Sequence, residues 1–306
     1  MGKFREFEVN QSELLKKLQE CHNLVFCSHD AGGAELLSSF IVANSLSGKF
    51  LVSGPATKVF RSKNLISETN QIAFLQADAS IILSSTGTTD FEYSNMLAGM
   101  KNGAKVIALL DHWVNYTERF ERQNKNIQPD LILVVDEYAS KIAEREFPRI
   151  EIVLIDNNFL EGIKKEYREL EVNHIEYDYV FLCESRHPNT SMEQRSDLNN
   201  LTELVYFFDM LRSIGKNEAR ILLRPHPSNL VIDYTEYVPK NFPSVKISAE
   251  ENLLKTLKAS QIVVGCNSMA LVIALTVGKR VYSAFKNPHS ILLPFAGIRP
   301  LSEINQ

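Results

Sequence analysis

The segment NLVFCSHDAGGAELLSSFIVANSL, residues 23–46, holds a short apolar run, a polar turn and a longer, mainly apolar stretch. Residues 23–28 show no polar alternation, which is typical of a strand covered on both faces in a parallel sheet. After the glycine-bearing turn, the pattern over 33–46 predicts a helix. A strand, a turn and a helix in this order indicate one unit of an α/β fold.

The same alternation recurs along the chain. The first half adds predicted helices over 89–103 and 137–147 and predicted strands over 50–54, 80–85, 105–110, 130–135 and 151–155. Residues 156–178 are polar and carry no strand pattern, so we place a linker there. The second half adds helices over 196–215 and from Ser268, and strands over 179–185, 220–227, 245–248, 262–265 and 280–285. The 306 residues suit two domains, which we place at 1–160 and 161–306. The predicted fold class is α/β, with two Rossmann-like doubly wound domains.

Composition and charge exclude several classes of protein. Hydrophobic residues make up 44% and charged residues 23% of the chain, which are ordinary values for a globular protein. The formal net charge is −4 and there is no basic run, which argues against nucleic acid as the main partner. The four cysteines are scattered, three of them in or beside apolar runs, which favours reduced core residues and a cytoplasmic protein.

The longest apolar run, residues 262–277, is shorter than the ~20 residues that a membrane-spanning helix needs. It also contains Asn267 and Ser268, so we expect a core segment and no transmembrane helix. The first residues lack an apolar stretch long enough for a signal peptide. A peripheral contact with a membrane stays open, and the sequence does not indicate an oligomeric state.

Polar side chains follow the predicted strands, at the carboxyl ends where open α/β sheets bind ligands. In ILLRPHPSNL, residues 221–230, His226 stands between two prolines, which fix φ and hold the imidazole in place. Asn267 and Ser268 stand where a strand gives way to a helix, whose free N–H groups and dipole favour an anion. We predict that His226 and Ser268 bind a phosphate group. The alternative is that His226 only shapes a turn and Ser268 only caps the helix. Arg224 either meets the phosphate bidentately or pairs with a carboxylate.

These two motifs, RPHPS and GCNSMALVIALTVGKRVYS, resemble those of bacterial glycosyltransferases of the GT-B type, in particular the sialyltransferase and Kdo-transferase branches. The resemblance is strongest over residues 179–290. It implies two Rossmann-like domains that face each other across a cleft, with a nucleotide sugar held by the C-terminal domain. It also implies that His226 with Pro227, and Ser268 with Asn267, contact the phosphate of the donor.

The turn after the first predicted strand is a candidate site in the N-terminal half. Gly32 and Gly33 would let the backbone approach a ligand closely, and Asp30 stands at the end of the strand. The G-x-G-x-x-G spacing is missing, so a dinucleotide cofactor is not supported. In many GT-B enzymes the equivalent loop faces the acceptor and the donor sugar. For Asp30 we therefore weigh catalysis or sugar binding against helix capping.

The segment SSTGTTDFEYS, residues 84–94, carries hydroxyl groups and one glycine between a strand and a helix. Ser85 and Thr86 could cradle a carboxylate or phosphate with the help of backbone N–H groups, with Glu92 nearby on the helix. The spacing from Thr89 to Glu92 also fits a capping box. The two interpretations are compatible.

The segment LLDHWVNYTERF, residues 109–120, concentrates polar and aromatic groups just after a strand. Asp111 with His112 could supply a general base, and Trp113 with Asn115 could hold a sugar. Adjacent residues on a strand point in opposite directions, so one member of the Asp111-His112 pair could be purely structural.

A second His-Pro pair, His187 with Pro188, lies in CESRHPNTS, residues 183–191. Its place after the first strand of the second half suits a loop over the donor phosphates, assisted by Ser185 and Arg186. It suits a solvated loop equally well.

The sequence and the resemblance together predict a glycosyltransferase that moves a sugar from a nucleotide-sugar donor to a glycan acceptor in surface-polysaccharide synthesis. The motifs favour a CMP-linked acidic sugar and leave UDP and GDP donors open. The histidines are dispersed and no H-E-x-x-H or Asp-x-Asp pattern occurs, so we expect neither a metal nor another cofactor. The alternatives are a nucleotide-sugar hydrolase, a non-reducing epimerase on the same fold, or a binding protein without activity.

Overall fold

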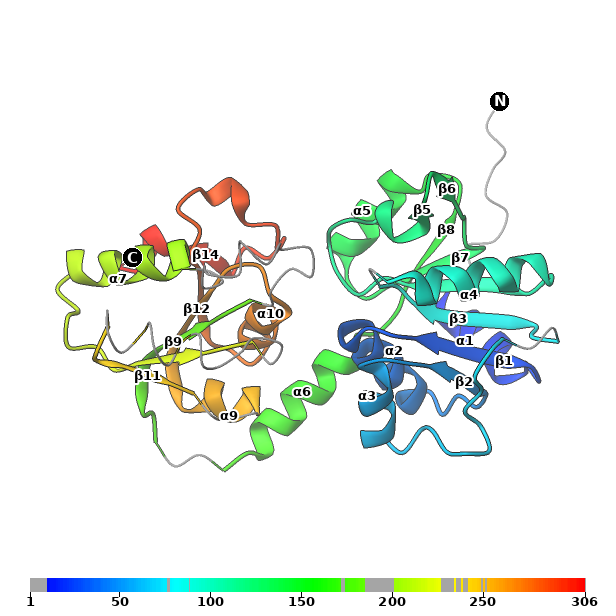
Figure 1. Ribbon diagram of the computed structural model, residues 1–306, viewed down its shortest axis with the longest axis horizontal. Coiled ribbons are helices and arrows are strands. Elements are labelled where there is room, and N and C mark those ends of the chain that lie inside the picture. The colour runs from blue at the N-terminus through cyan, green and yellow to red at the C-terminus, as the bar shows by residue number, and fades with distance from the viewer. Residues whose placement is uncertain are drawn as a thin grey trace. The chain divides into compact units, whose positions relative to one another are not determined.

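The computed structural model of the protein describes residues 10–75, 78–87, 89–171, 174–184, 201–226, 234, 238, 242–248, 250 and 252–305. The chain forms two compact units, Met1–Gly162 and Ile163–Gln306, which we call the first and second domain. Each contains a six-stranded parallel sheet with helices packed against it (Figure 1). The predicted fold class, α/β with two Rossmann-like domains, is confirmed.

The sheet of the first domain grows from the predicted aliphatic runs. β1 is buried along its whole length, as a strand covered on both faces should be. The strand order is β2 (Lys49–Val52), β1 (Leu24–Ser28), β3 (Ile81–Ser85), β4 (Lys105–Leu109), β7 (Leu131–Val134) and β8 (Glu151–Leu154). A short antiparallel ribbon, β5 (Glu121–Arg122) with β6 (Lys125–Asn126), follows the 3-10 turn η1 (Glu118–Phe120).

Helices alternate with these strands. They are α1 (Gln11–Gln19), α2 (Ala31–Ala43), α3 (Ala56–Ser62), α4 (Asp90–Lys101) and α5 (Glu137–Glu146). Side-chain oxygens of Asn10, Thr89 and Asp136 accept the free N–H groups at the starts of α1, α4 and α5, which fixes where these helices begin. The apolar faces of the helices and of the sheet form a core that includes Phe26 and Leu109.

The second domain repeats this architecture. Its strand order is β11 (Val245–Ile247), β10 (Ile221–Arg224), β9 (Tyr177–Leu182), β12 (Ser260–Gly265), β13 (Arg280–Ser283) and β14 (Ile298–Pro300). Its helices include α7 (Leu201–Ser213), α9 (Leu253–Lys258) and α10 (Met269–Thr276), with 3-10 turns η3 (Pro288–Ser290) and η4 (Leu301–Glu303). A separate core forms around Phe181 and Phe207.

Several elements were not predicted from the sequence, namely the helices α1, α3, α6 and α9, the ribbon of β5 and β6, and the strand β14. The span 156–178, predicted as a linker, contains the helix α6 (Asn158–Glu169), whose start is held by Asn157 Oδ1 accepting from Leu160 N at 3.0 Å. The edge strand β14 was not predicted because its segment, Ile-Arg-Pro, contains no aliphatic run. The first five residues of the helix predicted over 196–215 lie outside the described residues.

The strand orders locate the places where each sheet can bind a ligand. In the first domain the chain moves from β1 to β2 on one side and then places β3 on the other side of β1. The second domain does the same around β9, with β10 on one side and β12 on the other. Ligands of open α/β sheets bind beyond the carboxyl ends of the strands at such a reversal. The sites should therefore lie beyond β1 and β3, and beyond β9 and β12.

Along the described parts of the chain, the structure contains no helix that combines the length and the apolar character needed to span a bilayer.

Candidate functional site

The first domain brings the predicted residues of three loops to one edge of its sheet. The register places Cys27 of β1 level with Ser84 of β3, and Ser84 level with Ala108 of β4. The loops that follow these strands therefore start side by side. They carry the candidates from all three segments: Asp30, Gly32, Gly33, Ser85, Thr86, Glu92, Asp111, His112, Trp113 and Asn115.

Glu92 is the buried centre of this group, with only 1% of its surface exposed. Its Oε1 accepts from the backbone N–H of His29 at 2.8 Å and of Asp30 at 3.4 Å, and from Ser85 Oγ at 3.4 Å. Burial raises the pKa of this carboxyl, while the N–H donors oppose the rise. Thr89 caps α4, as its spacing predicted, and its Oγ1 also donates to Glu92 Oε2 at 3.2 Å.

Asp30 occupies the N-cap position of α2 without making a side-chain capping bond. Its Oδ1 instead lies 2.8 Å from Nδ1 of His29, so the capping alternative does not describe its side chain. The glycines allow close packing here, since a Cβ on Gly32 would lie 3.1 Å from Asp111 Oδ2 and one on Gly33 would lie 2.8 Å from Ser85 Cβ. The start of α2 therefore rests directly against the β3 and β4 loops.

Asp111 does not pair with His112, as the sequence suggested, but with Arg119. The guanidinium lies 2.5 Å from Asp111 Oδ1 and also donates to the Thr86 backbone oxygen and to Thr86 Oγ1, at 3.0 and 2.8 Å. His112 Nδ1 is buried and has no hydrogen-bond partner among the described residues. Burial lowers the pKa of His112, with the charge of Asp111 opposing this and that of Arg119 adding to it.

Trp113 is only 6% exposed, and its Nε1 donates to Asp136 Oδ2 at 2.9 Å. The indole is therefore largely buried, and a contact of Trp113 with a sugar stays a prediction. Asn115 is exposed, with a left-handed φ of 57°. Both residues line a groove of about 260 Å³, together with Arg145 and Glu146 of α5.

The second domain also brings its predicted residues to the carboxyl ends of its strands. Arg224 ends β10 level with Leu182 of β9, and His226 follows two residues later. Burial lowers the pKa of His226, and the charge of Arg224 lowers it further. Burial also lowers the pKa of Arg224, against the opposing charge of Glu250. Both effects disfavour the protonated form of the His226 imidazole.

The start of α10 is open to a further acceptor. Ser268 is its N-cap residue but makes no side-chain capping bond, and its buried Oγ has no partner among the described residues. Asn267 already has hydrogen-bond partners. Its Nδ2 donates to Ser290 O at 3.0 Å and its Oδ1 accepts from Leu292 N at 2.9 Å. Its backbone N–H donates to Glu184. The Asn267 side chain thus bonds to the loop that holds Ser290 and Leu292, and its contact with a phosphate stays a prediction.

Two residues of these sites, His29 and Glu184, were not selected from the sequence, and Arg119 was noted in its segment without a role. His29 and Glu184 each follow a buried strand within a loop that was already singled out, which is the signal that could have found them. Arg119 is eight residues from Asp111, and only the fold of the loop brings the two together. The residues Pro227, Ser185, Arg186, His187 and Pro188 lie outside the described part of the chain.

Within the described ranges, no three His, Cys, Asp or Glu side chains gather closely enough to hold a metal ion.

Comparison with known proteins finds no matching family model and no matching curated protein. Solved structures do match. UDP-GlcNAc 2-epimerase from Methanocaldococcus jannaschii, solved with UDP-GlcNAc and UDP, is 13% identical over 85% of this chain and 83% of its own, with a TM-score of 0.60. S. aureus MnaA, solved with UDP, is 11% identical over 85% and 78%, with a TM-score of 0.59. UDP-GlcNAc 2-epimerase from Neisseria meningitidis, bound to UDP-GlcNAc, is 9% identical over 88% and 84%, with a TM-score of 0.54. At these identities the likeness establishes the fold, two Rossmann-like domains in one chain.

Proposed function

We propose that the protein is an enzyme that acts on a nucleotide sugar, whose phosphate is bound in the second domain. The observation that carries this proposal is the start of α10, where the Ser268 hydroxyl is buried without a partner beside free helix N–H groups. Such a helix start favours an anion through its N–H groups and dipole. Arg224 and His226 supply further donors at the end of a nearby strand. We propose that these groups hold the phosphate. The Glu184 carboxylate lies close to Asn267 and disfavours an anion beside it, so we place the phosphate on the side of Ser268 that faces away from Glu184.

Of the reactions on such a ligand, we favour epimerisation of a UDP-linked amino sugar. Two of the similar structures contain UDP-GlcNAc and another contains UDP, which favours a UDP donor over the CMP-linked acidic sugar expected from the motifs. Epimerisation at a carbon requires removal of a proton from one face and its return to the other, so it needs groups that exchange protons. The first domain offers such groups in His29, Asp30, Glu92 and Asp111.

Glycosyl transfer is the second candidate, and one observation favours it. The first domain carries two open grooves, of about 500 and 260 Å³, which would accommodate a second substrate such as a glycan acceptor. In this reaction a base takes the proton from an acceptor hydroxyl, the oxygen bonds to the anomeric carbon, and the bond to the phosphate breaks. Donors fixed around the phosphate would stabilise the departing nucleotide.

The four cysteines are free, and Cys27, Cys183 and Cys266 are buried. Free, buried thiols suit a reducing compartment, so we propose the cytoplasm as the location.

One experiment tests the function and separates the two reactions. The purified protein is incubated in D2O with UDP-GlcNAc, with and without candidate glycan acceptors, and is followed by proton NMR. An epimerase exchanges the proton at carbon 2 for deuterium and produces the second sugar isomer without an acceptor. A transferase leaves that proton in place and releases UDP only when an acceptor is present. If UDP, CMP and GDP and their sugars all leave the thermal unfolding midpoint unchanged at millimolar concentration, the proposal of a nucleotide-sugar enzyme is wrong.

A further inference from the structure

His29 and Asp30 form a hydrogen-bonded pair at the reversal point of the first sheet. His29 Nδ1 lies 2.8 Å from Asp30 Oδ1, and the two side chains keep 25% and 32% of their surfaces exposed. A carboxylate beside Nδ1 favours the tautomer that carries the proton on Nδ1, because only an N–H can donate to it. Nε2 then holds the lone pair. The pair therefore presents one defined basic nitrogen to a region that solvent reaches.

The surrounding chain fixes this pair in place. The backbone N–H of His29 donates to buried Glu92 at 2.8 Å, and the His29 carbonyl accepts from Ala56 N at 2.9 Å. Gly54 adopts a φ of +55° beside the ring, and a Cβ there would lie 2.5 Å from His29 Nε2. Only glycine suits both the backbone angle and this approach. The imidazole thus loses little further freedom when a ligand binds.

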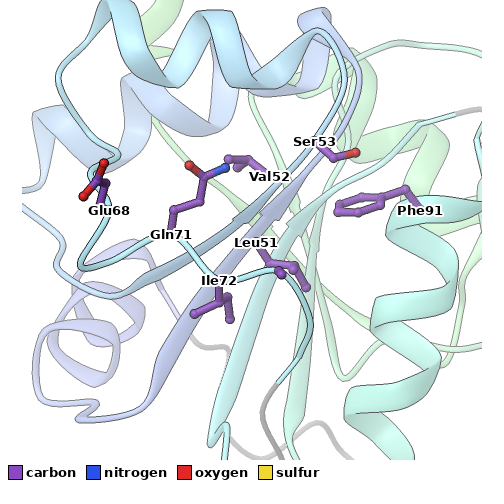
Figure 2. A pocket seen from close by; sticks show the side chains of 8 residues that line it. Leu51, Val52, Ser53, Glu68, Gln71, Ile72 and Phe91 are labelled. Carbon is purple, nitrogen blue, oxygen red and sulfur yellow. The ribbon is translucent and has the colours of Figure 1, made fainter.

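Near the pair, Phe91 also lines a groove of about 500 Å³ (Figure 2). Phe91 lines the groove and its ring centroid lies 5.8 Å from that of His29, while Ser53 N donates to the carbonyl of Ser28 at 3.2 Å. Figure 2 shows the Ser53 hydroxyl and the Phe91 ring on one side of the groove and the Gln71 amide on the other.

The lining of this groove fits a hydroxylated ring. The apolar walls come from Leu51, Ile72 and Phe91, and the polar groups are the Ser53 hydroxyl, the Gln71 amide and the Glu68 carboxylate. An aromatic face packs against the C–H face of a sugar, while amide, hydroxyl and carboxylate groups bond to its hydroxyls. The lining has no cationic side chain, so it does not favour a phosphate. The chemical class indicated is the sugar part of a ligand.

Other candidates for proton transfer in this domain are less suited. The Asp111 carboxylate is engaged by Arg119 at 2.5 Å, and the buried His112 has no orienting hydrogen bond at Nδ1. His29 has both an orienting carboxylate and access to solvent.

We propose that His29, oriented by Asp30, transfers a proton to and from a sugar ring bound in this groove. In the forward step Nε2 takes a proton from the sugar, so the bond between that hydrogen and the sugar breaks, an N–H bond forms and the electron pair of the broken bond stays on the sugar. The imidazolium is stabilised by Asp30 and later returns the proton. His29 is the base and Asp30 is a positioning residue. The proposal rests on the proposed action on nucleotide sugars.

The first test uses the full chain with UDP-GlcNAc, and with an acceptor if one is found. His29→Ala should lower kcat by roughly a hundredfold or more, which is the usual contribution of a general acid or base. Added imidazole should restore part of this loss, which a purely structural role of His29 does not predict. Asp30→Asn should lower kcat with little change in KM.

UDP affinity should stay unchanged in both variants. His22→Ala, at an exposed histidine of the same domain, should behave as the wild type. Full activity in His29→Ala would overturn the proposal.

The second test does not depend on turnover. In protein labelled with ¹⁵N-histidine, the His29 ring should show the tautomer protonated at Nδ1, and Asp30→Asn should shift it towards a mixture. N-acetylglucosamine should perturb the His29 Nε2 signal in the wild type and do so less in Phe91→Leu. A ring protonated at Nε2, or a signal that the sugar leaves unchanged, would overturn the proposal. If the wild type acts on no nucleotide sugar while these signals behave as expected, the proposed function fails and the sugar site stands.

Discussion

At the scale of single residues, Glu92 connects the first two loops of the N-terminal sheet. It accepts from the backbone of His29 and Asp30, and Thr89 Oγ1 donates to its Oε2 at 3.2 Å. We predict that Glu92→Ala lowers the free energy of unfolding substantially, because each buried donor left without an acceptor costs about 1–3 kcal/mol. Glu92→Gln should cost much less, since it keeps Oε1 and resembles the protonated carboxyl that burial favours. Urea unfolding of both variants measures this. Equal losses of unfolding free energy in the two variants would contradict the role of Glu92 as a hydrogen-bond acceptor.

The proposed phosphate contacts make a second prediction at this scale. His226→Ala and Ser268→Ala should each weaken UDP binding by about 1.5–3 kcal/mol, the range for a hydrogen bond to a charged group. Titration calorimetry measures the affinity. His174→Ala serves as the matched control, because His174 is an exposed histidine of the same domain that precedes β9, at the opposite end of the strand. Unchanged affinity in both site variants would show that the phosphate binds elsewhere.

His112 makes a prediction about pH. Its pKa is lowered from 6.5 by burial, so below that pH the unfolded chain takes up a proton that the folded chain does not. The free energy of unfolding of the first domain should therefore fall as the pH falls below about 6.5. His112→Asn should reduce this dependence, and His22→Asn, at an exposed position, should not. Urea unfolding between pH 5 and pH 8 measures it. If the free energy of unfolding of His112→Asn falls with pH as steeply as that of the wild type, the pH dependence does not come from His112.

For single residues, the sequence predicted the positions at strand ends but not the hydrogen-bond partners. The strand ends were predictable, because polar residues directly after aliphatic runs mark them, and Asp30, Ser85, Glu92 and Asp111 were selected in this way. Partners were not predictable, since Trp113 meets Asp136 and Asp111 meets Arg119 only through the path of the loop. A sequence position fixes which strand end a side chain follows, but not the direction in which the chain then turns.

At the scale of elements, the same contrast has a physical cause. Continuous aliphatic runs such as that of β1 report burial on both faces, so each predicted strand within the described residues was found. α6 has no buried residue, and its polar composition concealed it. The C-terminal part of the helix belongs to the second domain and is supported there, for Lys258 Nζ donates to the carbonyls of Tyr167 at 2.9 Å and of Leu170. Cations near a helix C-terminus are favourable because of the helix dipole.

Gly162 lies inside α6, at the end of the first unit, and gives a prediction for this element. A Cβ there would meet nothing within 4 Å, so packing does not require the glycine. Gly162→Ala should raise the free energy of unfolding by about 0.4–1 kcal/mol, because alanine loses less backbone freedom on folding. Gly99→Ala is the counterpart within α4, where the new Cβ would lie 2.0 Å from Ile82 Cδ1 and should be destabilising. Thermal unfolding of both variants checks the signs. A loss of stability in Gly162→Ala would show that the helix needs the glycine.

At the scale of the whole molecule, each domain has its own sheet, its own core and its own set of polar residues at the strand ends. This organisation was predictable, because a series of alternating strands and helices occurs twice along the chain. The two domains differ in the chemistry of these polar residues. The first domain concentrates carboxylates and histidines, which exchange protons, while the second offers a helix start with an unpartnered hydroxyl, which favours an anion. We assign the proposed phosphate site to the second domain and the proposed sugar groove to the first.

We therefore predict that the nucleotide and the sugar protect different domains against hydrogen exchange. UDP alone should slow exchange in the second domain, at the end of β10 and the start of α10, because a ligand suppresses the local opening of the segments it binds. UDP-GlcNAc should slow these amides too and should add protection around His29 and along the groove beside Val52. The amides of α1, which carries no proposed site, provide the internal control. Mass spectrometry of the intact chain with each ligand measures the pattern.

Protection of the first-domain loops by UDP alone would reverse the assignment of the two domains. Protection confined to the second domain with both ligands would mean that the sugar does not reach the first.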